Sequence, residues 1–340
     1  MKRYRVTIVG ATGLVGRELA KVLYQRRFPL SELCLLASSR SAGQSLQAGT
    51  REITVEETKT TSFRDTDLVF FAASSEVSAY FTRYAVRAGA LVIDVSHGHR
   101  QGKGKGKVPL IVPEINGEAL QEPAPVIACP GSVSTILAMA LYPLHVAATL
   151  ERAVVTTYQA VSDRGRAAME ELSAQARRVL QGKPVIPHVL AHQVAFNVLP
   201  ETDVFFDSGY SREEWRIGQE VCQLLNAPNL GLSMTTAWVP AYVGHAMAVH
   251  AQFESAIDRQ EAHRFLAAMP GVRVLDDPGV SLYPHPWAAA GTDDVLVGRV
   301  REDPTFENGL ALWVVGDNLR KGKALNAVQI AELVVERGWL

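Results

Sequence analysis

The stretch "YRVTIVGATGLVGRELAKVLYQR", residues 4–26, decides the fold. An apolar run leads into closely spaced glycines, and apolar residues at helical spacing follow, which predicts a strand, a tight turn and a helix. The glycines form a GxxGxxG pattern where strand meets helix, so backbone amides at the helix N-terminus can receive a pyrophosphate. Without such flanks, glycines at this spacing are more often turn residues. The residues expected to bind a dinucleotide are Gly10, Thr12, Gly13, Leu14, Val15 and Gly16.

Four further apolar runs predict strands in the first part of the chain. They are "ELCLLAS" at 32–38, "DLVFFAA" at 67–73, "ALVIDVS" at 90–96 and "PVIAC" at 125–129. Helical segments lie between several of them, and this alternation predicts an α/β fold with a Rossmann-type doubly wound parallel sheet. We place this nucleotide-binding domain at residues 1–131.

The pattern changes in the second part of the chain. A long amphipathic segment at 165–180 precedes two stretches with strand-like alternation, at 232–243 and 245–254. They predict a second domain of the α+β class at residues 132–317. The terminal segment 318–340 has helical periodicity, and we expect its helix to return to the first domain.

Composition limits the possible partners. The chain has 340 residues, of which 47% are hydrophobic and 20% charged, and its formal net charge is -1. This balance gives no reason to expect nucleic acid or a membrane surface as a partner. No apolar run approaches the roughly 18 residues of a membrane span. Three irregularly spaced cysteines predict neither a disulfide framework nor a metal site, so we expect a soluble cytoplasmic protein.

The end of the second predicted strand indicates which dinucleotide binds. An NAD enzyme usually carries an acidic residue there for the ribose hydroxyls, whereas this chain reads "ASSRSAG" at 37–43. Hydroxyls and a guanidinium fork suit a 2′-phosphate, which favours NADP, although a solvated loop would also explain an arginine here. The residues expected to hold the phosphate are Ser38, Ser39, Arg40 and Ser41.

Several motifs occur together in one order along the chain. They include "GATGLVG", "ASSRSAG", "VIDVSHGHR", "VPLIVPEIN", "TYQAVSDRG", "HQVAFNVLP", "LVGRVREDP" and "LWVVGDNLRKGKALNA". With these motifs the chain resembles the aspartate-semialdehyde dehydrogenase family along nearly its whole length. The resemblance implies an amino-acid biosynthesis enzyme that oxidises a small aldehyde with NADP. It also implies that the second domain binds substrate and forms a homodimer.

The resemblance also exposes a changed nucleophile. In the family a cysteine in a "P-N-C-S-T" loop attacks the aldehyde, NADP takes the hydride, and phosphate cleaves the thioester. Here the loop reads "ACPGSVST" at 128–135, and Ser132 stands in the cysteine's place. Cys129 could substitute as nucleophile, but a small buried apolar side chain is the commoner role of a free cysteine. An alcohol is also harder to ionise than a thiol, so the family reaction should be severely slowed.

Other family positions carry over unevenly. His245 matches the acid/base histidine, and Gln159 matches the glutamine beside the acyl intermediate. Trp238 stands where the family has an arginine for the substrate carboxylate, although an indole there can equally fill the core. The remaining matches are Arg100 for phosphate, Glu213 for substrate, Arg216 for a phosphate-binding lysine, and Asn318 for a nicotinamide-side contact. Arginines are usually surface cations in weak ion pairs, which is the alternative for both of them.

Three hypotheses follow from these departures. The first is an NADP-binding member of the family with weak or altered activity. The second is a catalytically inactive paralogue of the Usg type with a structural or regulatory role. The third is a hydrolase built on Ser132 and His245. It is the weakest because the sequence shows neither an orienting acid for the histidine nor a G-x-S-x-G elbow.

Overall fold

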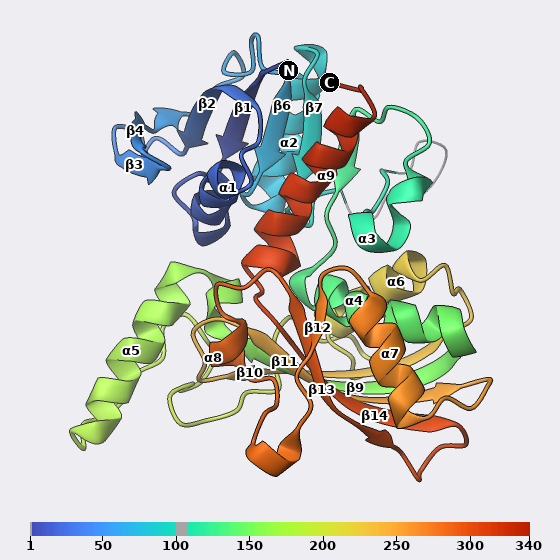
Figure 1. Cartoon of the computed structure of the whole chain (residues 1–340). Coiled ribbons are helices and arrows are strands. Elements are labelled where there is room, and N and C mark those ends of the chain that lie inside the picture. The colour runs from blue at the N-terminus through green and yellow to red at the C-terminus, as the bar shows by residue number, and fades with distance from the viewer. Residues whose placement is uncertain (1, 100–107) are drawn as a thin grey trace. The chain divides into compact units, whose positions relative to one another are not determined.

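The computed structural model describes residues 2–99 and 108–340, and the chain divides into two compact units (Figure 1). Unit 1 consists of Met1–Gly131 together with Lys323–Leu340, and unit 2 is Ser132–Gly322. The segment 318–340, which we treated as one piece, is divided between the two units: its residues up to Gly322 belong to unit 2 and the rest to unit 1. Its first residues stay in unit 2 because the buried Asn318 amide bonds to that unit, accepting from the Gly244 N–H at 2.9 Å.

Unit 1 is built on a six-stranded sheet in the order β5-β2-β1-β6-β7-β8, and every pair in it is parallel. The strands are β1 (Tyr4–Val9), β2 (Leu30–Ala37), β5 (Glu56–Glu57), β6 (Leu68–Phe71), β7 (Leu91–Asp94) and β8 (Val126–Ala128). A hairpin of β3 (Ser45–Ala48) and β4 (Arg51–Thr54) lies beside it. The predicted Rossmann-type parallel sheet is confirmed.

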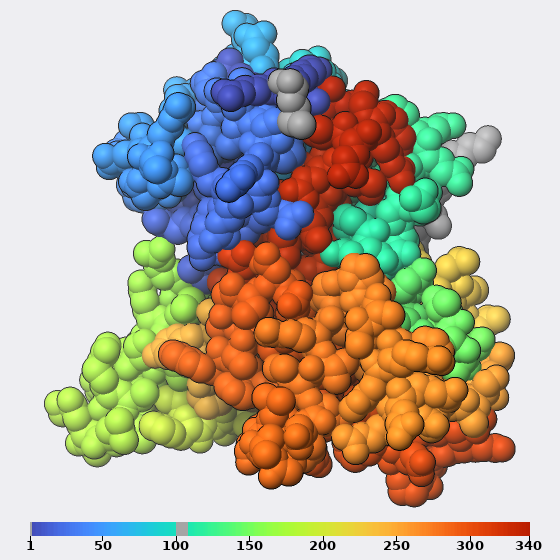
Figure 2. All heavy atoms as spheres, viewed as in Figure 1, coloured from blue at the N-terminus to red at the C-terminus, as the bar shows by residue number. Residues whose placement is uncertain are grey.

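Helices cover both faces of this sheet. Val6 and Ile8 belong to the apolar core that includes α1 (Leu14–Gln25) and α9 (Leu325–Glu336). Val9, one residue on and pointing the opposite way, packs in the core that includes α2 (Ser75–Arg87). Figure 2 shows the atoms of the C-terminal segment, in red, beside the blue atoms of the N-terminal segment. The short α3 (Pro113–Asn116) and a 3₁₀ turn (Gly117–Ala119) also contact this region.

Unit 2 has a mixed sheet in the order β10-β9-β11-β14-β13-β12. The pairs β9/β10 and β12/β13 are parallel, and the remaining pairs are antiparallel. The strands are β9 (Leu150–Ala160), β10 (Gly231–Val239), β11 (His245–Phe253), β12 (Val272–Val274), β13 (Val295–Glu302) and β14 (Gly309–Gly316). The expected second domain of helices and strands is confirmed.

Three helices cover one face of the unit 2 sheet, and the first of them contacts the other two. They are α4 (Ser132–Ala148), α6 (Arg212–Leu224) and α7 (Arg259–Ala268). The short α8 (Pro286–Ala289) contacts β14. Burial alternates along β9, so Val155 and Thr157 are buried whereas Val154 is 43% exposed.

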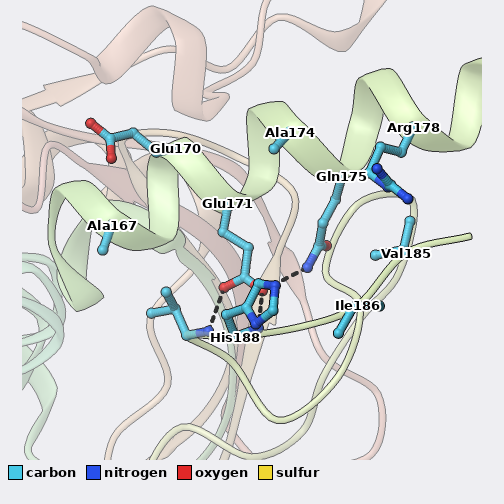
Figure 3. Close-up of a pocket in the computed structure, with 10 residues that line it drawn as sticks. Ala167, Glu170, Glu171, Ala174, Gln175, Arg178, Val185, Ile186 and His188 are labelled. Atoms are coloured by element: carbon cyan, nitrogen blue, oxygen red, sulfur yellow. Dashed lines mark hydrogen bonds between the residues drawn. The ribbon is translucent and has the colours of Figure 1, made fainter.

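Helix α5 (Arg166–Leu180) is attached to the following segment by two buried polar side chains (Figure 3). The Glu171 carboxylate accepts the backbone N–H groups of residues 188–190 at 2.7, 2.8 and 3.2 Å. It also accepts the side-chain amide of Gln175 at 2.9 Å. The Gln175 carbonyl oxygen in turn accepts the N–H groups of Val194 and Ala195. Side chains on one face of α5 therefore accept the backbone N–H groups of a segment that has no regular secondary structure.

Within residues 2–99 and 108–340, no helix is long and apolar enough to cross a membrane. In the same part of the chain, no group of three or more His, Cys, Asp or Glu side chains is arranged to hold a metal ion. The three cysteines form no disulfide.

Candidate active site

The glycine turn of unit 1 packs helix α1 directly against its strand. Gly10 has φ +85°, and a Cβ added there would lie 2.4 Å from the carbonyl oxygen of Ala72. A Cβ at Gly16 would lie 2.3 Å from the carbonyl oxygen of Gly10. Gly13 donates its N–H to that same oxygen at 3.1 Å. Backbone therefore occupies the space that a side chain would need at the first and third glycines.

A cavity of about 340 Å³ lies beside this turn, at the carboxyl ends of β6 and β7. It is lined by Val15, Ala72, Ala73, Ser74, Ser75, Glu76, Val95, Ser96, His97 and Lys323. The strand order reverses between β2 and β6 on either side of β1, and dinucleotides bind at such a switch point in open α/β sheets. Thr12 and Leu14 stand at the same turn, where the Thr12 carbonyl oxygen accepts the Arg17 Nε–H at 3.0 Å.

The predicted 2′-phosphate residues occupy a turn that follows β2. Ser38, Ser39 and Arg40 are exposed directly after the strand, and Ser41 donates its N–H to the Ser38 carbonyl oxygen at 2.9 Å. β2 is the neighbour of β1 in the sheet, so the turn stands at the edge where the glycine turn lies. Its hydroxyls and guanidinium are available to a ligand.

The predicted phosphate-binding Arg100 lies outside the described residues, but the segment that leads to it is well anchored. The buried Asp94 carboxylate pairs with His99 Nδ1 at 2.6 Å and accepts the Ser96 N–H at 2.9 Å. Burial alone would raise the pKa of Asp94, but the bonds from His99 and Ser96 hold that pKa below its usual value. The carboxylate therefore fixes the backbone after β7.

In unit 2 the residue at the nucleophile position opens helix α4. Ser132 is 4% exposed, and its hydroxyl donates to Oδ1 of Asp163 at 3.2 Å. Asp163 lies in a 3₁₀ turn (Val161–Arg164) that follows β9. The fully buried His245, the first residue of β11, places Nε2 3.9 Å from the same carboxylate oxygen. The structure thus groups Ser132 and His245 around an acid.

The hydrogen bond at the other ring nitrogen fixes the protonation pattern of His245. The Ala160 backbone N–H donates to His245 Nδ1 at 3.0 Å, so this nitrogen must be unprotonated. The neutral imidazole then carries its proton on Nε2, the nitrogen that faces Asp163. In this arrangement Nε2 is a hydrogen-bond donor and cannot take a proton from Ser132.

Gln159 and Asn318 are both fully buried and hydrogen-bonded within unit 2. The fully buried Gln159 donates through Nε2 to Thr157 Oγ1 at 3.2 Å. Asn318 donates through Nδ2 to the Ser162 hydroxyl at 2.9 Å. Its Oδ1 accepts the Gly244 N–H, next to His245, at 2.9 Å. Asn318 therefore ties the turn that carries Asp163 to the start of the histidine strand.

A second carboxyl group is buried close to Asp163. Glu213 on α6 is 8% exposed, and burial, followed by the nearby charge of Asp163, raises its pKa to about 7. A hydrogen bond to Thr202 and the cation of Arg216, one helical turn along α6, oppose this rise in the pKa of Glu213. Asp163 and Glu213 are therefore neighbouring carboxyl groups, and Arg216 is a cation close to Glu213.

Residues 5–122 match the family model described as "Semialdehyde dehydrogenase, NAD binding domain", and residues 141–321 match "Semialdehyde dehydrogenase, dimerisation domain". An aspartate-semialdehyde dehydrogenase of Synechocystis sp. is 41% identical, covering 99% of this chain and 98% of its own length. An aspartate-semialdehyde dehydrogenase of Aquifex aeolicus is 42% identical, covering 98% of this chain and 99% of its own length. The chain belongs to the aspartate-semialdehyde dehydrogenase family. The crystal structure of aspartate semialdehyde dehydrogenase II of Vibrio cholerae, complexed with ASA, matches with a TM-score of 0.94, 38% identity and 99% coverage of both chains.

Membership in the aspartate-semialdehyde dehydrogenase family confirms the family resemblance seen in the sequence motifs. Unit 1 carries the family's NAD-binding domain, and the chain has the fold of an NAD(P)-binding oxidoreductase of amino-acid biosynthesis. The match to the dimerisation domain, residues 141–321, lies entirely within unit 2, which begins nine residues earlier at Ser132 and ends at Gly322.

Two residues weighed from the sequence lie in apolar surroundings. Cys129 is fully buried in the core of unit 1, and its N–H donates to the Asp94 carbonyl oxygen at 2.8 Å. Trp238 is 2% exposed and packs with Leu172, Leu190 and other residues of an apolar cluster at α5. Both environments agree with the roles of core side chains that the sequence left open.

Sequence reasoning missed Asp163. It lies four residues after Gln159 in "TYQAVSDRG", the motif used for the glutamine, and it is an acid close to His245 that the sequence alone did not show. The acid is 31 residues from Ser132 and 82 from the histidine along the chain, and only the folded arrangement brings them together. The sequence offered one signal, namely that Asp163 is an acidic residue close to Gln159, a position matched to the family.

Proposed function

We propose that the chain is an NADP-binding oxidoreductase of the aspartate-semialdehyde dehydrogenase family with weak or altered activity toward a small aldehyde. The assigned catalytic positions are Ser132, His245 and Gln159, with Glu213, Arg216, Arg100 and Trp238 as the substrate positions. The observation that carries the proposal is the proton arrangement around Ser132. Its hydroxyl faces a carboxylate, and the imidazole nitrogen nearest to that carboxylate already bears a proton.

This arrangement disfavours the family's covalent chemistry. A serine needs a base before it can attack a carbonyl, and the basic nitrogen of His245 is bound to the Ala160 N–H instead. An oxygen ester, even if formed, is a poorer acyl donor to phosphate than a thioester. We therefore expect little phosphorylating dehydrogenation, and an apolar or uncharged substrate suits the Trp238 position better.

For the cofactor, we propose NADP rather than NAD. The exposed turn after β2 offers Ser39 and Arg40 to a 2′-phosphate, and no acidic residue occupies 38–41. Asn318 is assigned to the nicotinamide side. Calorimetric titration with both dinucleotides tests the preference, and equal affinity would overturn the assignment of the phosphate residues.

The decisive experiment measures NADPH formation from aspartate semialdehyde, phosphate and NADP. The unmodified protein should give little or none. Ser132→Cys restores the thiol, Trp238→Arg restores a cation, and the double variant should exceed either single variant. Because Trp238 is buried in an apolar cluster, thermal melting must first show that the arginine variants fold. Robust turnover by the unmodified protein would refute the proposal.

The alternative is a catalytically inactive paralogue of the Usg type that keeps a structural or regulatory role. The replacement of both the nucleophile and the carboxylate anchor supports it, whereas the intact glycine turn argues for retained nucleotide binding. NADPH formed or consumed with any aldehyde would exclude this alternative. A hydrolase built on Ser132 remains the weakest hypothesis, because His245 Nε2 bears a proton, and absence of ester hydrolysis would remove it.

We further propose that the protein acts as a homodimer in the cytoplasm with no nucleic-acid or membrane partner. The match of residues 141–321 to a dimerisation domain supports self-association. Sedimentation at several protein concentrations tests this part.

A further inference from the structure

A hollow of about 560 Å³ lies at the amino end of β2 in unit 1. It is formed by the residues that join α1 to β2 and by the tip of the β3–β4 hairpin, at Thr50 and Arg51. Strands β1 and β2 are parallel, and the glycine turn follows the carboxyl end of β1. The hollow therefore lies at the opposite edge of the sheet from the dinucleotide cavity, and its ligand is independent of the proposed function.

Three arginines from three separate segments line this hollow. Arg3 precedes β1, Arg27 follows α1, and Arg51 is the first residue of β4. All three are exposed, and none of their side chains forms an ion pair within the described ranges 2–99 and 108–340. Arg26 differs from its neighbour Arg27, because its guanidinium pairs with both carboxylate oxygens of Glu332 at 2.7 Å. Three guanidinium groups are thus available to one ligand.

The carboxylates near the hollow oppose an anion only weakly. Among the described residues that line it, Glu32 is the one carboxylate, and its Oε2 pairs with Arg5 Nε at 3.3 Å. Glu52 follows Arg51 along β4, and strand alternation turns its side chain to the other face of the hairpin. The hollow therefore carries an excess of positive charge.

The backbone of Arg27 has a conformation that favours glycine. Arg27 follows the C-cap residue of α1 and has φ +57°. The N–H groups of Arg27 and Phe28 donate to the carbonyl oxygens of Tyr24 and Leu23 at 3.1 and 2.9 Å, a helix ending that usually has glycine at this position. The same bonds satisfy carbonyl groups whose partial negative charge would disfavour an anion. A side chain costs free energy in this conformation, so a role of the guanidinium in the hollow would explain why arginine stands there.

The groups that line the hollow indicate the class of ligand. Guanidinium groups bind phosphate oxygens through two parallel hydrogen bonds, and three of them match a chain of linked phosphates better than a single one. Ser31 and Thr50 add hydroxyl groups to the same lining. We propose that the hollow binds a polyphosphate anion, either inorganic or carried by a nucleotide, at a site separate from the dinucleotide cavity.

The test is calorimetric titration of the whole protein with inorganic triphosphate, with excess NADP present to occupy the glycine turn. Arg27→Gly removes one guanidinium and suits the left-handed backbone. The variant should bind triphosphate at least tenfold more weakly, while its midpoint in urea unfolding stays the same or rises. Arg51→Ala should show the same loss of affinity. The matched control is Arg87→Ala, which removes an exposed arginine from the last turn of α2, on the other face of the sheet, and should bind triphosphate as the unmodified protein does.

Equal triphosphate affinity of the unmodified protein and Arg27→Gly would overturn the proposal, as would an equal loss in Arg87→Ala or no binding by the unmodified protein. A loss confined to Arg40→Ala would also overturn it, because the anion would then lie at the turn after β2. A parallel titration with ATP distinguishes the two sources of the phosphate chain. Tighter binding of ATP than of triphosphate assigns a nucleotide, and equal or weaker binding assigns the inorganic anion. Failure of the protein to bind NADP would sink the proposed function, whereas the Arg27 and Arg51 variants judge this site alone.

Discussion

Among single residues, a glycine of the glycine turn and a glycine of helix α6 differ in the space that surrounds them. Gly16→Ala would put a Cβ 2.3 Å from the Gly10 carbonyl oxygen, so it should lower the free energy of unfolding by about 1 to 3 kcal/mol and weaken NADP binding. Gly218, on α6, has no atom within 4 Å of an added Cβ. Gly218→Ala should therefore stabilise the protein by about 0.5 to 1 kcal/mol. Urea unfolding of both variants checks the contrast, and equal stability would contradict it.

We expect Arg40 to bind the 2′-phosphate of NADP. Its guanidinium is exposed after β2, so Arg40→Ala should leave the fold unchanged. The variant should lose on the order of 1.5 to 3 kcal/mol of NADP affinity, the worth of a hydrogen bond to a charged group. NAD affinity should barely change. Calorimetry with both dinucleotides measures the difference, and an equal loss for NAD and NADP would show that Arg40 does not bind the 2′-phosphate.

Contacts between residues that are close along the chain can be predicted from the sequence, whereas contacts between distant residues cannot. The glycine pattern is local, because Gly10 and Gly16 contact each other within one strand, turn and helix. The contact between Ser132 and Asp163 joins the start of α4 to a turn after β9, and no periodicity in the sequence encodes it. Long-range contacts of this kind follow only from the packed sheet.

At the scale of elements, the boundaries show which local rules override periodicity. The predicted helix at 165–180 begins at Arg166, since Gly165 has φ +88° and stands outside the helix. The stretch predicted as a strand at 232–243 stops at Val239, because Pro240 has no N–H to donate to the sheet. Hydrophobic patterning thus locates an element, while backbone chemistry sets its ends.

Among the helices and strands, we expect α5 to hold the segment 188–190 in place through Glu171. Glu171→Ala removes the acceptor of three backbone N–H groups, at residues 188–190, and of the Gln175 amide. We expect a loss of about 2 to 4 kcal/mol in unfolding free energy. We also expect faster amide hydrogen exchange in that segment. The control is Glu170→Ala, its exposed neighbour on the same helix, which should change neither quantity. Unchanged exchange in the first variant would show that the segment is held by other contacts.

For the whole molecule, the buried Glu213 predicts how stability depends on pH. Its pKa is raised to about 7, so between about pH 4.5 and 7 the folded state binds a proton that the unfolded chain releases. Stability from this group is therefore full at low pH and falls as the pH rises through 7. Relative to Glu213→Gln, the protein should lose roughly 2 to 4 kcal/mol between pH 5 and 8. Urea unfolding at both values measures this, with Glu170→Gln as control. Parallel behaviour of the protein and Glu213→Gln would contradict it.

The last prediction concerns assembly. Helices α4, α6 and α7 cover one face of the unit 2 sheet, and Val154 and Tyr158 lie on the opposite face of β9. A sheet face that bears an exposed valine and partly buried aromatic rings suits a second copy of the chain, in keeping with the match to a dimerisation domain. Val154→Lys should raise the dimer dissociation constant at least tenfold, because the ammonium would be buried on association. Val146→Lys, at a 67% exposed position near the end of α4, is the control and should leave the dimer intact. Sedimentation velocity over a range of concentrations decides, and a monomeric unmodified protein would refute the prediction outright.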